Sequence, residues 1–215
     1  MKSVYIVGAG GLGREVYDWM HEALDFHNEY RFAGFLDDNR AALQGFALNA
    51  SITPLKDYCY EEGDCLICGI GNPELKNKLC QPLVEAGAEF LTLIHPSAKV
   101  GARSEIGRGS VVCPQVVVTC DVRIGAFVLL NLTTTVGHDA CIGDWSTLSA
   151  HCDVTGSVQL GPSVFMGSGA RIIPKKTVGA SATIGAGSVV IRDVSEGCSV
   201  FGNPARTIFS RSSKN

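Results

Sequence analysis

A six-residue repeat constrains the fold of this chain more than any other feature. From Val100 to Val190 every sixth residue is aliphatic or methionine, sixteen times in succession. With 46% of the chain hydrophobic, chance placement has odds of about four in a million before the register is chosen. The next position is glycine nine times, and the position two earlier is nearly always small or β-branched, Lys176 being the clear misfit.

A period of six matches neither the 3.6 of an α-helix nor the 2 of a flat strand. It is typical of a parallel β-helix in which short strands and turns stack. In each rung one large and one small side chain point inward, and glycine relieves crowding where the chain turns. Three rungs complete one coil, so we expect residues eighteen apart to stack with a spacing of about 4.8 Å.

The first ninety or so residues follow a different pattern. Apolar runs predict strands at 4–7, 32–36, 65–70 and 90–93, alternating with helical stretches at 14–23 and 73–86. Strands that alternate with helices indicate a small parallel α/β sheet. His95 and Pro96 interrupt the chain just before the repeat begins. We therefore expect an α/β domain at 1–93 and a β-helix domain with a short C-terminal tail at 94–215.

A glycine-rich loop, GAGGLG at 8–13, lies between the first strand and the first helix. Glycines there allow the main chain and a helix N-terminus to approach a phosphate. Asp37 and Asp38 end the second strand, where a carboxylate can accept hydrogen bonds from a ribose or a base. The pattern favours binding of a nucleotide moiety; packing alone and a nicotinamide enzyme are the alternatives.

Composition excludes several classes of protein. A net charge of −3 without a basic stripe argues against a nucleic-acid partner. No apolar run reaches the length of a membrane span, and the N-terminus is not a signal peptide, so we expect no membrane partner. Nine irregularly spaced cysteines indicate reduced thiols in the cytoplasm. Cys65 and Cys68 form C-x-x-C within an apolar run without a second pair, so we expect core residues and no metal.

Several motifs together resemble one family of enzymes. They are GAGGLGR at 8–14, FLDD at 35–38, GIGN at 69–72, IHPSA at 94–98, VGHD at 136–139 and GNPAR at 202–206. The chain resembles the bacterial sugar O- and N-acetyltransferases, which join a nucleotide-sugar-binding, Rossmann-like α/β domain to a left-handed β-helix. The resemblance implies transfer of acetyl from acetyl-CoA to the amino group of a nucleotide-linked deoxysugar, in surface polysaccharide or glycan biosynthesis, by homotrimers with sites between subunits.

The resemblance also implies roles for individual residues. His138 matches the general base and Asp139 its acidic neighbour. The nucleotide-sugar positions are Gly10, Gly11, Leu12, Asp37, Asp38 and Gly71, and the acetyl-CoA positions are Thr147, Gly156, Ser168 and Ala186. Leu12 and Thr147 depart from the family, in which histidine often stands at the first of these positions and stands at the second in some members.

The eighteen-residue coil allows these roles to be tested against geometry. Gly156 should stack on His138 and leave space beside the imidazole for a thioester. Ser168 and Ala186 should form a second column on another side of the coil, so both columns can line one cleft only if a second subunit supplies one of them. His138 should be exposed, and Asp139 can assist it only if the pair straddles a corner.

Three other functions remain open from the sequence. The first is O-acetylation of a sugar or sialic-acid hydroxyl with the same base and donor. The second is a zinc hydratase on the same kind of β-helix, which needs three converging histidines that this spacing does not supply. The third is a non-catalytic scaffold that binds a sugar nucleotide.

Overall fold

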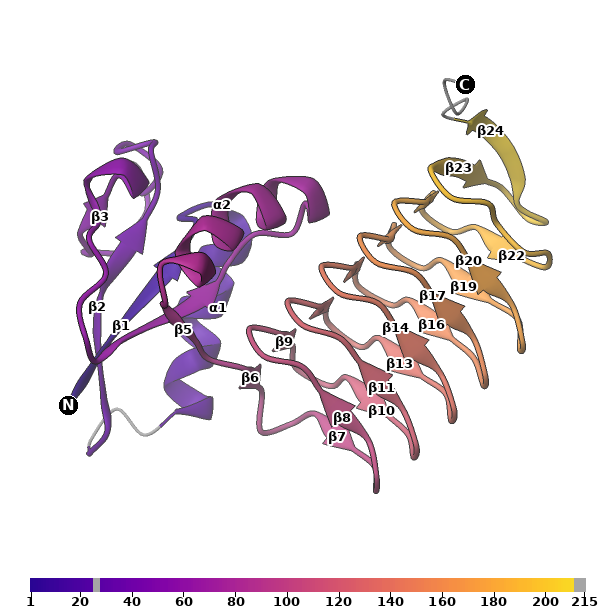
Figure 1. Ribbon diagram of the computed structural model, residues 1–215, viewed down its shortest axis with the longest axis horizontal. Helices are drawn as coiled ribbons and strands as arrows, with labels where there is room; N and C mark the ends of the chain where they lie inside the picture. The colour runs from indigo at the N-terminus through magenta and orange to yellow at the C-terminus, as the bar shows by residue number, and fades with distance from the viewer. Residues whose placement is uncertain (25–27, 211–215) are drawn as a thin grey trace.

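The computed structural model describes residues 1–24 and 28–210; residues 211–215, the end of the expected second domain, lie outside that description. An N-terminal α/β domain is followed by a long stack of triangular coils (Figure 1). The coils form a left-handed parallel β-helix, as the six-residue repeat and the resemblance predict.

The N-terminal sheet has the order β3-β2-β1-β4-β5, and all its pairs are parallel. Its elements are β1 Lys2–Val7, α1 Gly11–Ala23, β2 Tyr30–Leu36, β3 Ile52–Thr53, the 3-10 helix η1 Leu55–Asp57, β4 Asp64–Cys68, α2 Pro73–Glu85 and β5 Glu89–Phe90. Gly13, Val16 and Met20 form the buried stripe of α1. The order is that of half a dinucleotide-binding fold, in which ligands bind where the strand order reverses, here between β1 and β4.

The expected single strand at 90–93 is wrong. Glu89–Phe90 pairs with β4, whereas β6, Leu93–Ile94, already belongs to the β-helix. The backbone changes partner between Leu91, whose N–H donates to Leu66, and Leu93, whose N–H donates to Ser110. A continuous apolar run hides this change, so the division expected after residue 93 falls within β6.

Three parallel sheets form the sides of the β-helix. Face I contains β6, β9 Val111–Val112, β12 Leu129–Leu130, β15 Thr147–Leu148, β18 Phe165–Met166, β21 Thr183–Ile184, β23 Cys198–Phe201 and the antiparallel β24 Arg206–Ser210. Face II contains β7 Lys99–Val100, β10 Val117–Val118, β13 Thr135–Val136, β16 Asp153–Val154, β19 Arg171–Ile172 and β22 Val189–Val190. Face III contains β8 Glu105–Ile106, β11 Arg123–Ile124, β14 Cys141–Ile142, β17 Gln159–Leu160 and β20 Thr177–Val178.

The register confirms the eighteen-residue coil. Val118 pairs with Val136 and Val136 with Val154, each eighteen residues further along the chain. The repeated aliphatic residues fill the interior from Val112 onward, whereas Val100, in the first coil, is still 39% exposed. Stacking therefore supplies the burial that a single coil cannot provide.

The glycines that follow the aliphatic residues are needed for close approach between coils. A Cβ at Gly107 or Gly143 would lie 2.5 Å from backbone atoms of the next coil. The turns themselves use the left-handed region two positions later, as at Asp139 with φ 59°. Where this position is not glycine, the left-handed backbone directs a side chain outward from the corner.

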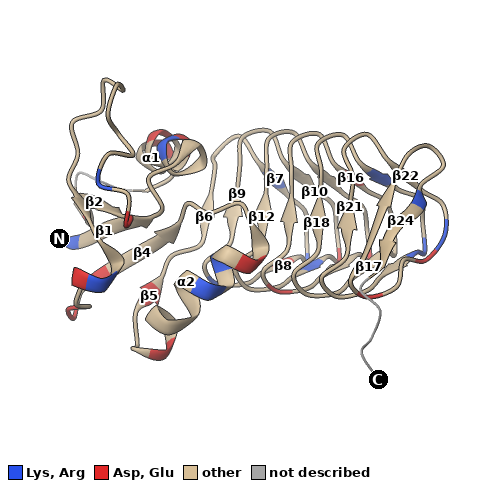
Figure 2. Ribbon diagram, turned by 90° about the horizontal axis from the view of Figure 1, so that it is seen from above, with Lys and Arg blue, Asp and Glu red and all other residues tan. Residues whose placement is uncertain are grey.

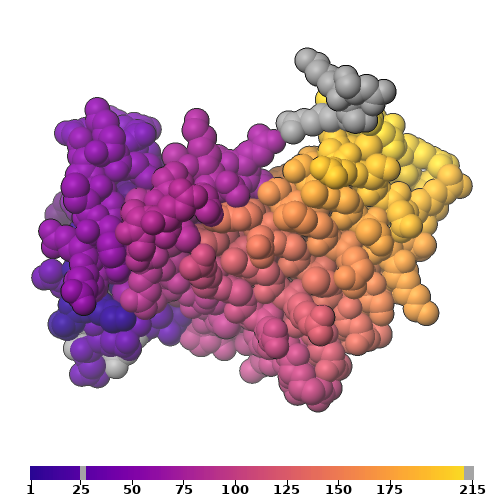
Figure 3. Space-filling view, in the orientation of Figure 1, coloured from indigo at the N-terminus to yellow at the C-terminus, as the bar shows by residue number. Residues whose placement is uncertain are grey.

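The α/β domain lies at the N-terminal end of the stack of coils, and α2 extends from it along face I (Figure 2). The outward side chains of Leu93, Val111 and Leu129 are consequently buried. His95, at the junction, is buried as well, and its Nε2 lies 3.2 Å from Glu22 of α1. The later coils, drawn in yellow, extend beyond the docked domain (Figure 3). None of the helices in the described part of the chain has the length and apolar character needed to cross a membrane.

Candidate active site

A pocket of about 380 Å³ lies at the carboxyl ends of β1 and β4. Its lining includes all six positions expected for a nucleotide sugar: Gly10, Gly11, Leu12, Asp37, Asp38 and Gly71. The sequence does not single out several other lining residues, notably Leu55, Asn72, Leu75 and Leu79. The signal for Asn72 is its place before Pro73, since it caps α2 by accepting a hydrogen bond from Leu75 N–H at 2.8 Å.

The glycines of the loop divide into two kinds. Gly8 has φ +97°, and a Cβ at Gly13 would lie 2.0 Å from the carbonyl oxygen of Gly8, so these two are required by the turn. A Cβ at Gly10 or Gly11 would meet no atom within 4 Å. Packing therefore does not explain glycine at positions 10 and 11, and the empty space beside them faces the pocket.

Asp37 and Asp38, which follow β2, have different hydrogen-bond partners. Asp37 accepts hydrogen bonds from Ala9 N–H and Asn39 N–H, both at 2.8 Å, so its carboxylate holds the glycine loop in place. Asp38 is exposed at the pocket and accepts one hydrogen bond, from Leu55 N–H at 3.0 Å. A carboxylate has about four acceptor sites, so Asp38 retains capacity for a ligand.

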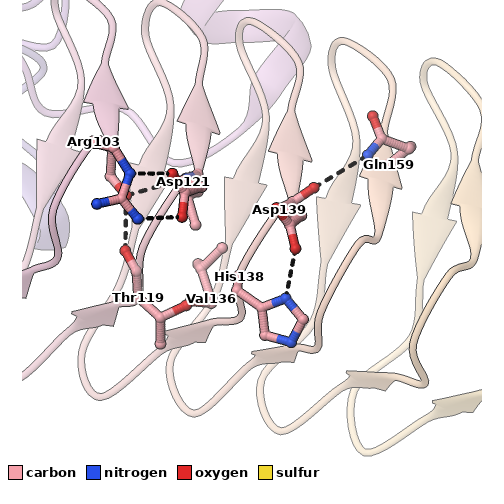
Figure 4. Close-up of polar contacts among 9 residues, drawn as sticks. Arg103, Thr119, Asp121, Val136, His138, Asp139 and Gln159 are labelled. Atoms are coloured by element: carbon pink, nitrogen blue, oxygen red, sulfur yellow. Dashed lines mark hydrogen bonds and ion pairs between the residues drawn. The ribbon is translucent and has the colours of Figure 1, made fainter.

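His138 lies at the edge between faces II and III, after β13 and before β14. Its side chain is 63% exposed, and the ring points away from the interior (Figure 4). In the next coil Gly156 lies against the ring, because a Cβ there would be 2.7 Å from Nε2 and 2.8 Å from Cε1. The absence of that Cβ leaves room beside Nε2.

Asp139 reaches the same ring across the corner. Its left-handed backbone, φ 59°, turns the carboxylate back, and Oδ2 lies 2.7 Å from His138 Nδ1 (Figure 4). A carboxylate at this distance can accept a hydrogen bond from Nδ1–H, and in that tautomer Nε2 keeps a free lone pair. His138 and Asp139 therefore straddle a corner of the coil, which is the arrangement that Asp139 needs in order to assist His138.

A second ion pair lies one coil away from this dyad. Arg103 donates to both carboxylate oxygens of Asp121 at 2.6 and 2.7 Å, and this pairing holds the pKa of Asp121 below its usual range. On the face III side a pocket of about 280 Å³ is lined by Asp121, Arg123, Asp139, Ala140, Cys141 and Gln159. Asp139 therefore links the imidazole of His138 to a pocket with a largely polar lining.

The positions expected to line an acetyl-CoA cleft are not brought together within one chain. Ser168 and Ala186 follow strands of face I, so they lie at the edge between faces I and II, where both are exposed. Gly156 lies at the edge between faces II and III. Thr147 is only 2% exposed and accepts a hydrogen bond from Lys76 Nζ, so in the single chain it has no surface to offer a ligand.

The nucleotide-type pocket and His138 lie on opposite sides of one chain. Gly71, at the pocket, lies next to Leu129 on face I. In a triangular prism face I is opposite the edge between faces II and III, where His138 lies. A ligand held in the pocket therefore cannot meet the imidazole of its own chain across the β-helix.

A metal centre finds no support in the part of the chain that is described. No group of three or more His, Cys, Asp or Glu side chains is placed to hold an ion. Cys65 and Cys68 are both buried, and Cys68 lies 3.7 Å from Cys80, not beside Cys65.

Comparisons with known proteins find matches to the N-terminal domain and to nearly the whole chain. Residues 3–83 match the PglD N-terminal domain family. GDP-perosamine N-acetyltransferase of Escherichia coli O157:H7 is 31% identical over 214 residues, covering 94% of this chain and 95% of that protein.

Solved structures match over nearly the whole chain as well. PerB from Caulobacter crescentus, in complex with CoA and GDP-perosamine, has 29% identity and a TM-score of 0.84, covering 96% of this chain and 97% of that one. The acetyltransferase domain of PglB from Neisseria gonorrhoeae FA1090, in complex with acetyl coenzyme A, has 28% identity and a TM-score of 0.84, covering 96% and 99%.

Proposed function

The chain belongs to the hexapeptide-repeat nucleotide-sugar N-acetyltransferases, and from this premise we propose how its residues carry out the reaction. The protein transfers an acetyl group from acetyl-CoA to the amino group of an amino sugar. We propose that the acceptor is a GDP-linked or similar 4-amino deoxysugar whose nucleotide occupies the pocket of the α/β domain. The open space at Gly10 and Gly11 supports this assignment.

We propose His138 as the general base. The acceptor amine loses a proton to Nε2 as its nitrogen attacks the thioester carbonyl, and the thiolate of coenzyme A leaves. Asp139 holds the Nδ1 proton and stabilises the imidazolium that forms. Gly156 N–H makes no hydrogen bond to an acceptor in the described residues, and we assign it to the oxyanion. No covalent enzyme intermediate is needed.

The catalytic unit in this proposal is a homotrimer. In the trimer, His138 and Gly156 of one subunit face the neighbouring subunit, which contributes its nucleotide pocket together with Ser168 and Ala186. The pantetheine arm of coenzyme A lies between the two subunits. The support is the placement of the two halves on opposite sides of one prism. Thr147 is left out of the cleft because α2 covers it.

We place the reaction in the cytoplasm, as a step of surface polysaccharide or glycan synthesis. Nine cysteines without a disulfide among the described residues suit a reducing compartment. A sugar is acetylated here while still linked to a nucleotide, so a glycosyl transfer must consume the product.

The test is acetylation of purified nucleotide-linked amino sugars, followed by mass spectrometry. The wild type should add one acetyl group that survives mild alkali, because an amide resists conditions that cleave an ester. His138→Asn should abolish turnover with an unchanged melting temperature. His21→Asn, at an exposed histidine on α1, is the control and should leave turnover intact. Acetylation by the His138 variant at the wild-type rate would remove the imidazole from the mechanism.

A further inference from the structure

Lys76 is buried where the two domains meet. Among the lysines and arginines in the described residues it alone is buried, with 1% of its surface exposed. Its Nζ donates hydrogen bonds to the carbonyl oxygen of Ser146 at 3.2 Å and to Thr147 Oγ1 at 3.1 Å. A side chain of the α/β domain thus reaches the backbone of face I.

The helix that carries Lys76 shapes the substrate pocket. Leu75 and Leu79, its neighbours on α2, line the nucleotide pocket together with Asn72 at the start of the helix. Asn72 also lines a second cavity, of about 250 Å³, between α2 and Phe165 of face I. The position of α2 on face I therefore sets where a ligand that leaves the nucleotide pocket meets the β-helix.

The ammonium group is buried, and no carboxylate of the described residues pairs with it. Burial lowers the pKa of Lys76 to about 8, and the neighbouring thiols of Cys68 and Cys80, which act in the opposite direction, offset only part of this shift. Removing an ammonium group from water costs several kcal/mol. Two hydrogen bonds to neutral oxygens offset only part of that cost, so stability alone does not explain a lysine here.

Apolar contacts already hold the domains together. Leu93, Val111 and Leu129 of face I are buried beneath the α/β domain. Apolar packing has no preferred direction and tolerates small shifts, whereas a buried donor with two fixed acceptors is satisfied in one position. Lys76 is placed to supply that directional constraint.

We propose that Lys76 is a positioning residue for acetyl transfer, which fixes α2, and with it the nucleotide-sugar pocket, at one place on face I. The inference rests on the proposed function, in which the nucleotide stays in this pocket and the amino group of the attached sugar extends to His138 of the neighbouring subunit. Lys76 touches no reacting atom. A displacement of about 1 Å from a reactive geometry costs on the order of a hundredfold in rate.

The test compares Lys76→Met, which keeps the length of the side chain, with Lys76→Arg, which keeps the donors. Lys78→Met, at an exposed position two residues further along α2, is the matched control. Lys76→Met should lower kcat at least tenfold while the Kd for GDP or UDP and the KM for acetyl-CoA stay within twofold. Lys76→Arg should recover most of kcat, and Lys78→Met should equal the wild type. A purely structural lysine would change the melting temperature without this separation of kcat from binding.

Amide hydrogen exchange tests the same proposal without an activity readout. Lys76→Met should speed exchange in α2 and around Thr147 at least tenfold and leave the glycine loop unchanged. If the wild type acetylates none of the sugars, the proposed function is wrong. The hydrogen-exchange result would still show whether Lys76 fixes the position of α2 on face I. Wild-type kcat in Lys76→Met, loss of nucleotide binding, or unchanged exchange would overturn the proposal. If Lys76→Met does not fold, Lys76→Gln is measured with the same expectations.

Discussion

Substitution of Gly156 by alanine tests the space beside the imidazole. The new Cβ would lie 2.7 Å from His138 Nε2, 2.8 Å from Cε1 and 3.2 Å from Cδ2. Non-bonded heavy atoms prefer about 3.5 Å or more, so the ring must move by about 0.8 Å. The atoms that move belong to an exposed side chain, so the fold should tolerate the change.

The displacement acts on catalysis. A shift of this size costs on the order of a hundredfold in kcat, which corresponds to about 2 to 3 kcal/mol in the activation barrier. The assay is steady-state turnover by mass spectrometry, together with a melting curve. Gly156→Ala should lose kcat and keep its melting temperature.

Gly143→Ala is the contrasting variant, because its Cβ would lie 2.5 Å from backbone atoms of Gly161 and Pro162. Backbone cannot move aside as a side chain does, so this variant should lose stability, by about 1 to 3 kcal/mol. Wild-type kcat in Gly156→Ala, or a loss of stability equal to that of Gly143→Ala, would refute the reasoning.

Three further predictions concern the carboxylates and the buried lysine. Asp139→Asn should lower kcat about tenfold or more at unchanged stability, because the Nδ1 proton loses its charged acceptor; equal kcat would show that the pair has no catalytic role. Asp37→Ala should weaken both nucleotide affinity and stability, since Ala9 N–H loses its partner, whereas Asp38→Ala should weaken affinity alone, as calorimetry and melting curves can separate. Burial lowers the pKa of Lys76 from 10.5 to about 8, so between pH 8 and pH 10.5 the unfolded chain binds more protons than the folded chain. The free energy of unfolding should therefore rise with pH over this range, by up to about 3 kcal/mol relative to Lys76→Met. Parallel curves of stability against pH for the two proteins would contradict this.

The β-helix could be predicted because its period is local and repeated. Once the coil length is known, the stacking of Gly156 on His138 follows from counting along the chain, and the register agrees. The glycine loop was also readable from sequence, since a strand–helix turn depends on adjacent residues.

Docking between the domains leaves no such periodic signal. Thr147 occupies an outward position like many others, and only the approach of α2 makes it buried. Lys76 reads as a surface residue of a polar helix until face I covers it. The change of partner at Thr92 was hidden for the same reason, because an apolar run does not say which sheet it joins.

The most direct test of a site shared between subunits uses two variants that are each inactive. His138→Asn removes the base. Gly10→Leu places a branched side chain in the pocket, starting from a Cβ position that no other protein atom approaches within 4 Å. After the two are unfolded together in equal amounts and refolded, random trimers should regain about a quarter of the wild-type activity, since one site in four combines an intact imidazole with an intact pocket. A mixture that stays inactive, although mass spectrometry detects the mixed trimers, would contradict the account.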